Sequence, residues 1–218
     1  MTQRPYIIVN VAQSLNGYIS GKAGRRVVIS SPEDMVRVHE LRSEVDAILI
    51  GSGTVIADDP RLLVDQNVVQ SAIPPVRVIL DRSMRAKPSS RVFDSSARTI
   101  VYTGGNRVDS RKCEIRTRDD QGLQIHNILQ ELHDDGIGKL LVEGGKTVIT
   151  QFIEERAIDE FYLYIGDVII EEGGLKLFTP GFEIRNIIKT VRPFGMGVLI
   201  SLDPYHLQRL WKTQVKDT

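Results

Sequence analysis

Apolar residues along the chain follow two different spacings. Short continuous runs rich in valine, isoleucine and leucine are typical of strands buried on both faces, whereas apolar residues repeated every three or four positions are typical of amphipathic helices. The continuous runs predict strands at residues 6–11, 47–50, 76–80, 99–102, 139–142, 161–165, 168–170 and 195–202. The second spacing predicts helices over residues 31–45, 123–133 and 146–156.

The helix over residues 31–45 has the clearest start signal. Ser31 is a capping residue, Pro32 suits the first helical position, and Glu33 and Asp34 are acidic residues in the first turn. Strands that alternate with helices in this way predict an α/β fold: a central, mostly parallel sheet with helices on both faces.

Two polar stretches, residues 65–75 and 106–121, are predicted to be surface loops. Neither has the composition of a linker between domains. The pattern therefore predicts a single domain over residues 1–218.

The composition narrows the class of protein. Of the 218 residues, 28 are Lys or Arg and 28 are Asp or Glu, so the formal net charge of zero argues against a protein that coats nucleic acid or anionic lipid. A single cysteine, Cys113, excludes an internal disulfide and multi-thiolate metal sites, and the four histidines are scattered without a ligand spacing, so no metal is expected. The apolar runs are too short to span a bilayer and the N-terminus lacks the order of a signal peptide, so we expect a cytoplasmic protein.

Three segments follow predicted strands, at the edge where open α/β sheets bind their ligands. The first segment is GSGT at residues 51–54, followed three residues later by DDPRL at 58–62. Its glycines let a ligand come close to the backbone, Thr54 offers the ligand a hydroxyl and Asp58 offers it a hydrogen-bond acceptor. The alternative for this segment is a simple turn.

Residues 143–147 (EGGKT) lie between a strand and a helix, where free N–H groups and the charge of Lys146 suit a phosphate or pyrophosphate. Residues 81–85 (DRSMR) carry two arginines and a serine, a set that suits the phosphate monoester of NADP. The alternatives are an ordinary strand-to-helix turn and a solvated charged turn.

The order and spacing of these segments resemble the reductase of riboflavin biosynthesis, which occurs alone or as the C-terminal half of a bifunctional deaminase–reductase. The combination of G-x-G-T-V-x-x-D-[DN]-P-x-L with a later E-G-G carries the resemblance, and the matching segments cover most of the first 165 residues. The resemblance implies a fold like that of dihydrofolate reductase and a homodimer. It also implies hydride transfer from NADPH, with NADH as the alternative, to C1′ of a ribosylaminopyrimidine 5′-phosphate.

The resemblance also implies roles for individual residues, although it marks none as certainly catalytic. Those matching cofactor positions are Ala12, Thr54, Asp58, Ser83, Gly144, Gly145, Lys146 and Thr147; those on the substrate side are Arg42, Arg61, Leu62 and Glu143. In this interpretation Arg42 lies on the inward face of its helix, where a charge is costly unless it meets an anion. Neighbouring acids on the helix, Glu40 and Glu44, point elsewhere.

The chain departs from the family in three places, one of which is Arg82, where serine is common. Asn16 and Tyr18 stand where the family usually has Asp and Lys or Arg, and the loop at 166–174 lacks the usual proline and is longer. Because the single cysteine excludes the zinc deaminase domain, we expect a reductase alone, acting on the diaminopyrimidinone. The alternatives are the deaminated aminouracil or another small molecule such as a pterin as substrate, and a nucleotide-binding module without catalysis.

Overall fold

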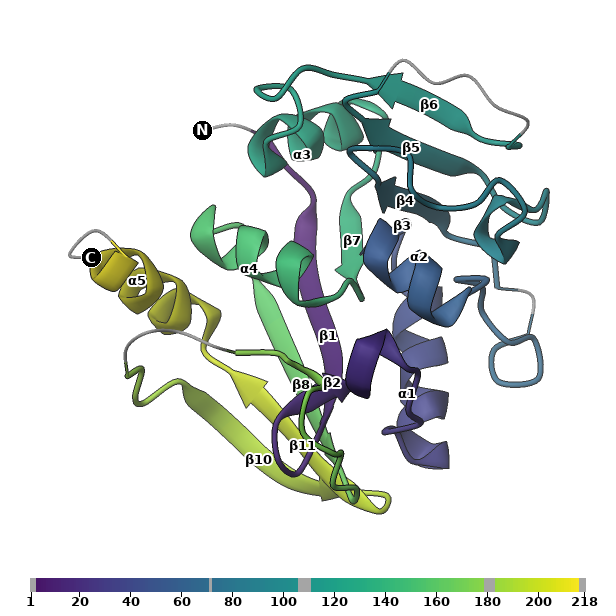
Figure 1. Cartoon of the computed structure of the whole chain (residues 1–218). Coiled ribbons are helices and arrows are strands. Elements are labelled where there is room, and N and C mark those ends of the chain that lie inside the picture. Colours follow the sequence, from purple (N-terminus) through teal and green to yellow (C-terminus); the bar gives the residue numbers. More distant parts are fainter. Residues whose placement is uncertain (1–2, 71, 106–110, 179–182, 216–218) are drawn as a thin grey trace. The chain divides into compact units, whose positions relative to one another are not determined.

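The computed structural model of the chain (Figure 1) describes residues 3–70, 72–105, 111–178 and 183–215. The chain forms two compact units, one made of Met1–Tyr6 and Val38–Gly144 and the other of Ile7–Arg37 and Gly145–Thr218. The single domain expected over residues 1–218 stays a prediction. Helix α1 (Pro32–Ser43) has residues in both units.

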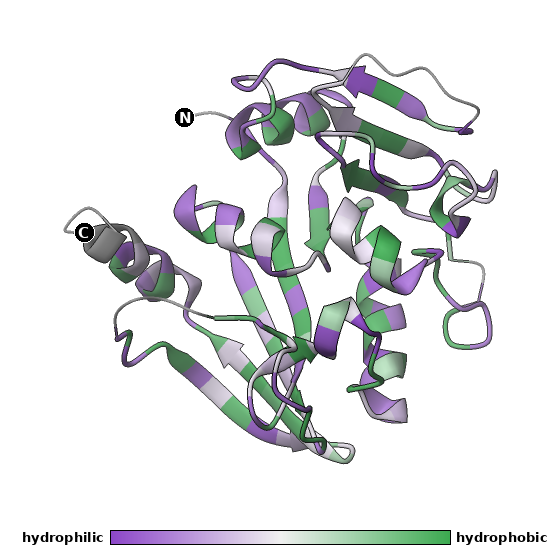
Figure 2. Cartoon of the chain, viewed as in Figure 1, coloured by the Kyte–Doolittle hydropathy of each residue, from purple (hydrophilic) through white to green (hydrophobic). Residues whose placement is uncertain are grey.

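The first unit is built on a parallel sheet. Its strands are β3 (Ala47–Gly51), β4 (Val76–Leu80), β5 (Thr99–Thr103), β6 (Glu114–Thr117) and β7 (Lys139–Val142), in the order β7-β3-β4-β5-β6. All of these pairings are parallel. Every residue of β3 and β5 is buried, which explains why both strands read as continuous apolar runs. Figure 2 shows the apolar residues gathered along β4 and β7.

Helices cover both faces of this sheet. Helix α2 (Ser52–Asp58) lies on the connection from β3 to β4, and α3 (Ile125–Asp134) lies on the connection that returns from β6 to β7. Because these connections run in opposite directions across the sheet and such crossovers are right-handed, the two helices lie on opposite faces. Together with the parallel pairings, this arrangement confirms the predicted α/β class.

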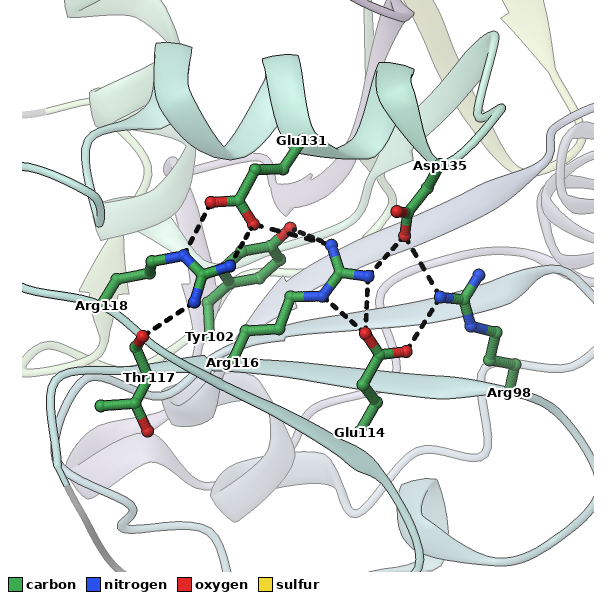
Figure 3. Close-up of polar contacts among 8 residues, drawn as sticks. All are labelled: Arg98, Tyr102, Glu114, Arg116, Thr117, Arg118, Glu131 and Asp135. Carbon is green, nitrogen blue, oxygen red and sulfur yellow. Dashed lines mark hydrogen bonds and ion pairs between the residues drawn. The ribbon is translucent and has the colours of Figure 1, made fainter.

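Strand β6 forms the outer edge of this unit, and a network of charged side chains joins it to β5 and α3 (Figure 3). Arg116 donates to Glu114 at 2.7 Å, to Asp135 at 2.6 Å and to the hydroxyl of Tyr102 at 3.0 Å. Arg118 forms a two-pronged ion pair with Glu131 at 2.7 and 2.9 Å. These contacts pair the charges of a polar strand and hold α3 against the sheet.

The second unit has a four-stranded sheet with one parallel pair. Its strands are β1 (Tyr6–Ser14), β8 (Glu160–Gly166), β10 (Ile188–Phe194) and β11 (Gly197–Leu202), in the order β10-β11-β8-β1. Strands β1 and β8 are parallel, and β11 is antiparallel to both of its neighbours. Helices α4 (Lys146–Glu154) and α5 (Pro204–Val215) belong to this unit. Buried Gln208 on α5 exchanges hydrogen bonds with the backbone of Ile158, just before β8.

A small second sheet joins the segments that follow β1 and β8. Strand β2 (Tyr18–Ser20) pairs with β9 (Leu175–Lys176) in antiparallel orientation. The backbones approach closely, because a Cβ atom at Gly174 would lie 2.3 Å from the Ser20 carbonyl oxygen. Two short 3₁₀ turns, at Lys22–Gly24 and Arg91–Phe93, complete the elements.

Two of the sequence expectations are wrong. Residues 168–170 form no strand, because the chain leaves the sheet after Gly166. The stretch 106–121 contains β6, which was missed because a polar edge strand lacks an apolar run; residues 106–110 lie outside the described part. The described part of the chain has no helix with the length and apolar character needed to cross a bilayer.

Candidate functional site

The loops after β3, β4 and β7 line one edge of the first unit, because parallel strands end at the same edge. Glu143 and Gly144 follow β7, Thr54 lies in α2 directly after β3, and Ser83 follows β4. Four residues predicted from the sequence therefore stand at the edge where α/β folds bind ligands.

Arg42 and Glu143 form the best-defined contact at this edge. The guanidinium donates from Nε to Oε1 of Glu143 at 2.8 Å and from Nη2 to Oε2 at 2.7 Å, a two-pronged ion pair. The side chains are only 15% and 12% exposed. Burial works against the charge of Arg42, but the Glu143 carboxylate outweighs it, so the pKa of Arg42 is raised. The inward placement expected for Arg42 is confirmed, and the anion that it meets is Glu143.

The loop after Pro60 is held against the same arginine. Arg42 Nη1 donates to the carbonyl oxygen of Leu63 at 3.1 Å, and the backbone N–H of Asp65 donates to Nδ1 of His39 at 3.1 Å. Leu62 is 2% exposed and adopts a φ of 54°, which a leucine rarely does. Such strain persists only where the surroundings fix it and is common at ligand sites.

His39 holds this loop, although the histidines have no ligand spacing in the sequence. Burial and the neighbouring Arg42 lower the pKa of His39, while Asp65 and Glu143 act in the opposite direction. A neutral imidazole accepts the Asp65 N–H. No spacing rule could find this residue, because its partner lies 26 residues away.

Arg61 is exposed, and its backbone is held by a hydrogen bond from the Arg77 side chain. Arg77 is fully buried and donates to the carbonyl oxygen of Arg61 at 3.4 Å, to Oδ1 of Asp94 at 2.9 Å and to Oγ1 of Thr99 at 2.8 Å. The strand therefore buries a charged residue whose donors fix the loop that carries Arg61 and Leu62. Among the described residues, no hydrogen bond or ion pair joins the Arg61 side chain to Arg42 or Glu143.

Thr54 lies in the first turn of α2, Asp58 is its last residue, and both are half-buried. The helix ends in a left-handed residue, Asp59 with a φ of 42°, whose carboxylate accepts from the N–H of Arg91 at 2.8 Å. The helix was missed from the sequence because it has only seven residues and no side-chain cap at its start.

The segment after β4 divides into a buried acid and exposed basic residues. Asp81 is fully buried and accepts from the backbone N–H groups of Arg85 at 2.8 Å and Ala86 at 2.9 Å. Ser83 is exposed, and Arg82 forms an ion pair with Asp120. Asp81 thus shapes the loop that presents Ser83.

The second unit carries the remaining predicted residues. Ala12 lies on β1, opposite Tyr164 of β8. Gly145 starts α4 as its capping residue without a side-chain cap, and no acidic residue follows in the first turn, which begins with Lys146 and Thr147. A helix start of this composition suits a phosphate or pyrophosphate group, because its backbone N–H groups and dipole favour an anion.

Asn16 and Tyr18, the two departures from the family pattern, have defined partners in this unit. The amide of Asn16 bonds to the backbone of Ile170, and the Lys176 ammonium lies 5.1 Å from the centroid of the Tyr18 ring. Nowhere in the described residues do three or more His, Cys, Asp or Glu side chains gather as a metal site.

Comparison with known proteins identifies the family. The model of the RibD C-terminal domain matches residues 5–200, nearly the whole chain. The chain belongs to this family. The family expected from the sequence motifs is therefore confirmed.

Relatives of the RibD C-terminal domain family match over most of the chain. The 2,5-diamino-6-ribosylamino-4(3H)-pyrimidinone 5′-phosphate reductase of Methanothermobacter thermautotrophicus is 34% identical over 195 residues, which are 87% of this chain and 90% of that protein. The riboflavin biosynthesis protein RibD of Aquifex aeolicus is 32% identical over 93% of this chain, which spans only 59% of that longer protein.

A solved structure has the same fold. The Thermotoga maritima diaminohydroxyphosphoribosylaminopyrimidine deaminase/5-amino-6-(5-phosphoribosylamino)uracil reductase matches with a TM-score of 0.79 at 28% identity. The match covers 91% of this chain and 56% of that one. These comparisons confirm the mostly parallel α/β architecture; the roles of the individual site residues remain predictions.

Proposed function

We propose that this protein is a reductase of riboflavin biosynthesis that acts on 2,5-diamino-6-ribosylamino-4(3H)-pyrimidinone 5′-phosphate and converts its ribosylamino group to the ribitylamino form. The observation that carries the proposal is the match to the M. thermautotrophicus reductase, 34% identical over 90% of that protein's length. The alignment thus takes in nearly all of a relative that is named for this reaction.

We propose NADPH as the reductant. When bound, a nicotinamide cofactor supplies the hydride that reduces C1′ of the opened sugar. The residues fit such a group: the helix start at Gly145, with Lys146 in its first turn, suits the pyrophosphate, and exposed Ser83 suits the 2′-phosphate of the adenosine end. NADH is the alternative, and the two are distinguished by their KM values.

The residues of the chain bind and orient the reactants in this proposal. Arg42 and Glu143 offer a pre-formed pair of complementary charges, in which the carboxylate accepts from amino or hydroxyl groups and the guanidinium attracts the phosphate. Arg42 and Arg77 donate to the carbonyl oxygens of Leu63 and Arg61 and so hold the loop that contains the strained residue Leu62. Holding two flat molecules in contact is the main contribution that hydride transfer needs from a protein.

The test is oxidation of NADPH by the purified protein, followed by the absorbance of the reduced nicotinamide. We expect oxidation that depends on the diaminopyrimidinone and is slower with the deaminated aminouracil. If NADPH is oxidised with the aminouracil but not with the diaminopyrimidinone, the aminouracil is the substrate. If NADPH binds but is oxidised with neither pyrimidine, the proposal is refuted. Asp58→Ala and Glu143→Ala should each abolish most turnover in a folded protein; near-normal turnover in both would refute the residue assignments.

We also propose a cytoplasmic homodimer. Strand β10 supports the dimer, because it is exposed along almost its whole length and carries Ile188 and Val191, which are 59% and 56% exposed. Figure 2 shows apolar and polar residues alternating along it. Light scattering after gel filtration tests this part: a mass near twice 24.5 kDa is expected, and a monomer at micromolar concentration would contradict it.

A further inference from the structure

The side-chain amide of Asn16 binds both backbone groups of one residue. Its Nδ2 donates to the carbonyl oxygen of Ile170 at 2.7 Å, and its Oδ1 accepts from the N–H of Ile170 at 3.1 Å. The same Oδ1 accepts from the hydroxyl of Ser14 at 2.7 Å. Only an amide can do this, because a carboxylate has no donor for the carbonyl oxygen. Asn16 therefore fastens the segment after β8 to the turn after β1.

The fastening extends to both sides. The N–H of Leu15 donates to the carbonyl oxygen of Val168 at 2.9 Å, and the Ser14 hydroxyl accepts from the N–H of Tyr18 at 2.9 Å. Ile170 is consequently buried, at 4% exposure, while Ile169 is 75% exposed. The position of Asn16 thus fixes both the start of β2 and the course of the segment that leads to β9.

Tyr18 and Lys176 stand opposite each other where these two strands pair. The ammonium of Lys176 lies 5.1 Å from the centroid of the Tyr18 ring, a favourable cation–π distance. Tyr18 is 8% exposed and Lys176 faces solvent. Within the described ranges, no carboxylate forms an ion pair with this ammonium. The Tyr18 ring beneath the ammonium restricts its conformations.

We propose that Lys176 binds a phosphate monoester of one reactant and that Asn16 is the positioning residue that places it. The pair lies beyond the carboxyl ends of the parallel strands β1 and β8, the edge where α/β folds bind ligands. The ligand group is a phosphate monoester, for which lysine serves as a point charge. The inference rests on the proposed function, whose reactants carry two such groups: the 5′-phosphate of the pyrimidine and the 2′-phosphate of NADPH.

Lys176→Met tests the binding role. We expect the KM of one phosphorylated reactant to rise about tenfold, as loss of a charge-assisted contact requires, with kcat within about twofold of the wild type. The dephosphorylated pyrimidine and NADH distinguish the sources, because the KM of the reactant that lacks the recognised phosphate should not change. Lys176→Arg should restore most of the affinity, and Lys87→Met, an exposed lysine of the other unit, should leave every KM unchanged.

Asn16→Asp tests the positioning role. This variant keeps the acceptor for the Ile170 N–H and loses the donor to its carbonyl oxygen, so we expect faster hydrogen exchange at the Ile170 amide and an increased KM for the same reactant as in Lys176→Met. Because Asn16 acts through Lys176, the variant carrying both substitutions should have the same KM as Lys176→Met alone.

Three results would overturn the proposal. They are an unchanged KM in Lys176→Met, an equal increase in KM for reactants with and without a phosphate monoester, and a KM in the double variant that is raised by the product of the two single effects. If the wild-type protein reduces neither pyrimidine, the proposed function fails separately. Calorimetric titration with ribose 5-phosphate and with NADP⁺ then decides the role of Lys176, since one of the two must bind about tenfold more weakly to Lys176→Met.

Discussion

The ion pair between Arg42 and Glu143 allows a test in which stability and activity should separate. Both side chains are largely buried, at 15% and 12% exposure, and their charges are joined by two hydrogen bonds. Replacement of one partner leaves the other charge buried without its counter-ion, whereas replacement of both leaves an apolar contact. The three variants to compare are Arg42→Met, Glu143→Met and the double variant.

The magnitudes follow from these contacts. Removing one partner of a buried pair costs about 3–5 kcal/mol, and the residual exposure here places the expected cost of Arg42→Met near the lower limit, about 3 kcal/mol. That variant also removes the donor to the Leu63 carbonyl oxygen, which is included in this figure. Glu143→Met should cost about 2 kcal/mol, because a long arginine can turn its charge toward water. The double variant should cost about 1 kcal/mol, less than either single change.

The assay is urea denaturation followed by circular dichroism, combined with NADPH oxidation in the absence of denaturant. We expect the double variant to recover stability and to remain inactive, because the site still lacks both charges. Additive losses of stability in the double variant would refute the reasoning that burial of an unpaired charge dominates. Retained turnover in the double variant would refute the placement of the pair in the site.

Other features give further tests. Helix α4 is followed by Arg156, which adopts a left-handed φ of 54°, and the N–H groups of Arg156 and Ala157 donate to the carbonyl oxygens of Ile153 and Phe152. Helix α3 ends with the same hydrogen-bond pattern, but there the left-handed residue is a glycine, Gly136. Arg156→Gly should therefore stabilise the protein by about 1 kcal/mol, and Gly136→Ala should destabilise it by a similar amount, as measured by urea denaturation. The Ser96 hydroxyl and Arg77 lower the pKa of Asp94 from 3.8 to about 2, so its contribution to stability is complete above about pH 4 and is lost as the pH falls toward about 2. Between about pH 4 and about pH 2, the free energy of unfolding of Asp94→Asn should fall less steeply than that of the wild type. The difference should be small because the carboxylate is 39% exposed, and identical slopes for the two proteins would contradict the assignment. Arg116→Met should cost about 2 kcal/mol, because the side chain is 12% exposed and its guanidinium contacts four partners, namely Glu114, Glu131, Asp135 and the Tyr102 hydroxyl. Arg98→Met, at 47% exposure beside two of the same acids, should change stability by less than about 0.5 kcal/mol. Equal effects of these two substitutions on urea denaturation would show that burial does not govern the network in Figure 3.

The sequence by itself determined the elements whose burial is nearly complete. Strands β3, β5 and β7 lie within one residue of their predicted ranges, because strands covered on both faces must be apolar throughout. The start of α1 was also readable, since a proline at the first position and two acids in the first turn are local signals. The motifs after β3 and β7 identified the family for the same reason: glycines and acids at fixed spacings are local.

Tertiary structure decided the elements that have no apolar pattern of their own. Strand β6 is polar and half-exposed, and it exists because β5 supplies its hydrogen bonds and α3 supplies partners for its charges. Helix α2 is too short to be recognised by periodicity, and strand β10 is exposed on both faces. Strand β10 is held by its hairpin with the apolar strand β11, and not by an apolar pattern of its own.

The same division holds at the site. The sequence indicated that Arg42 faces inward and must meet an anion, but the helix to which it belongs offers no such partner. The fold places Glu143 there, 101 residues further along the chain, and likewise Ile170 beside Asn16, 154 residues away. A sequence specifies which groups need a partner, because charge and hydrogen-bonding capacity are properties of single residues. Only the packed chain specifies the partner, because that depends on which distant segments the sheets bring together.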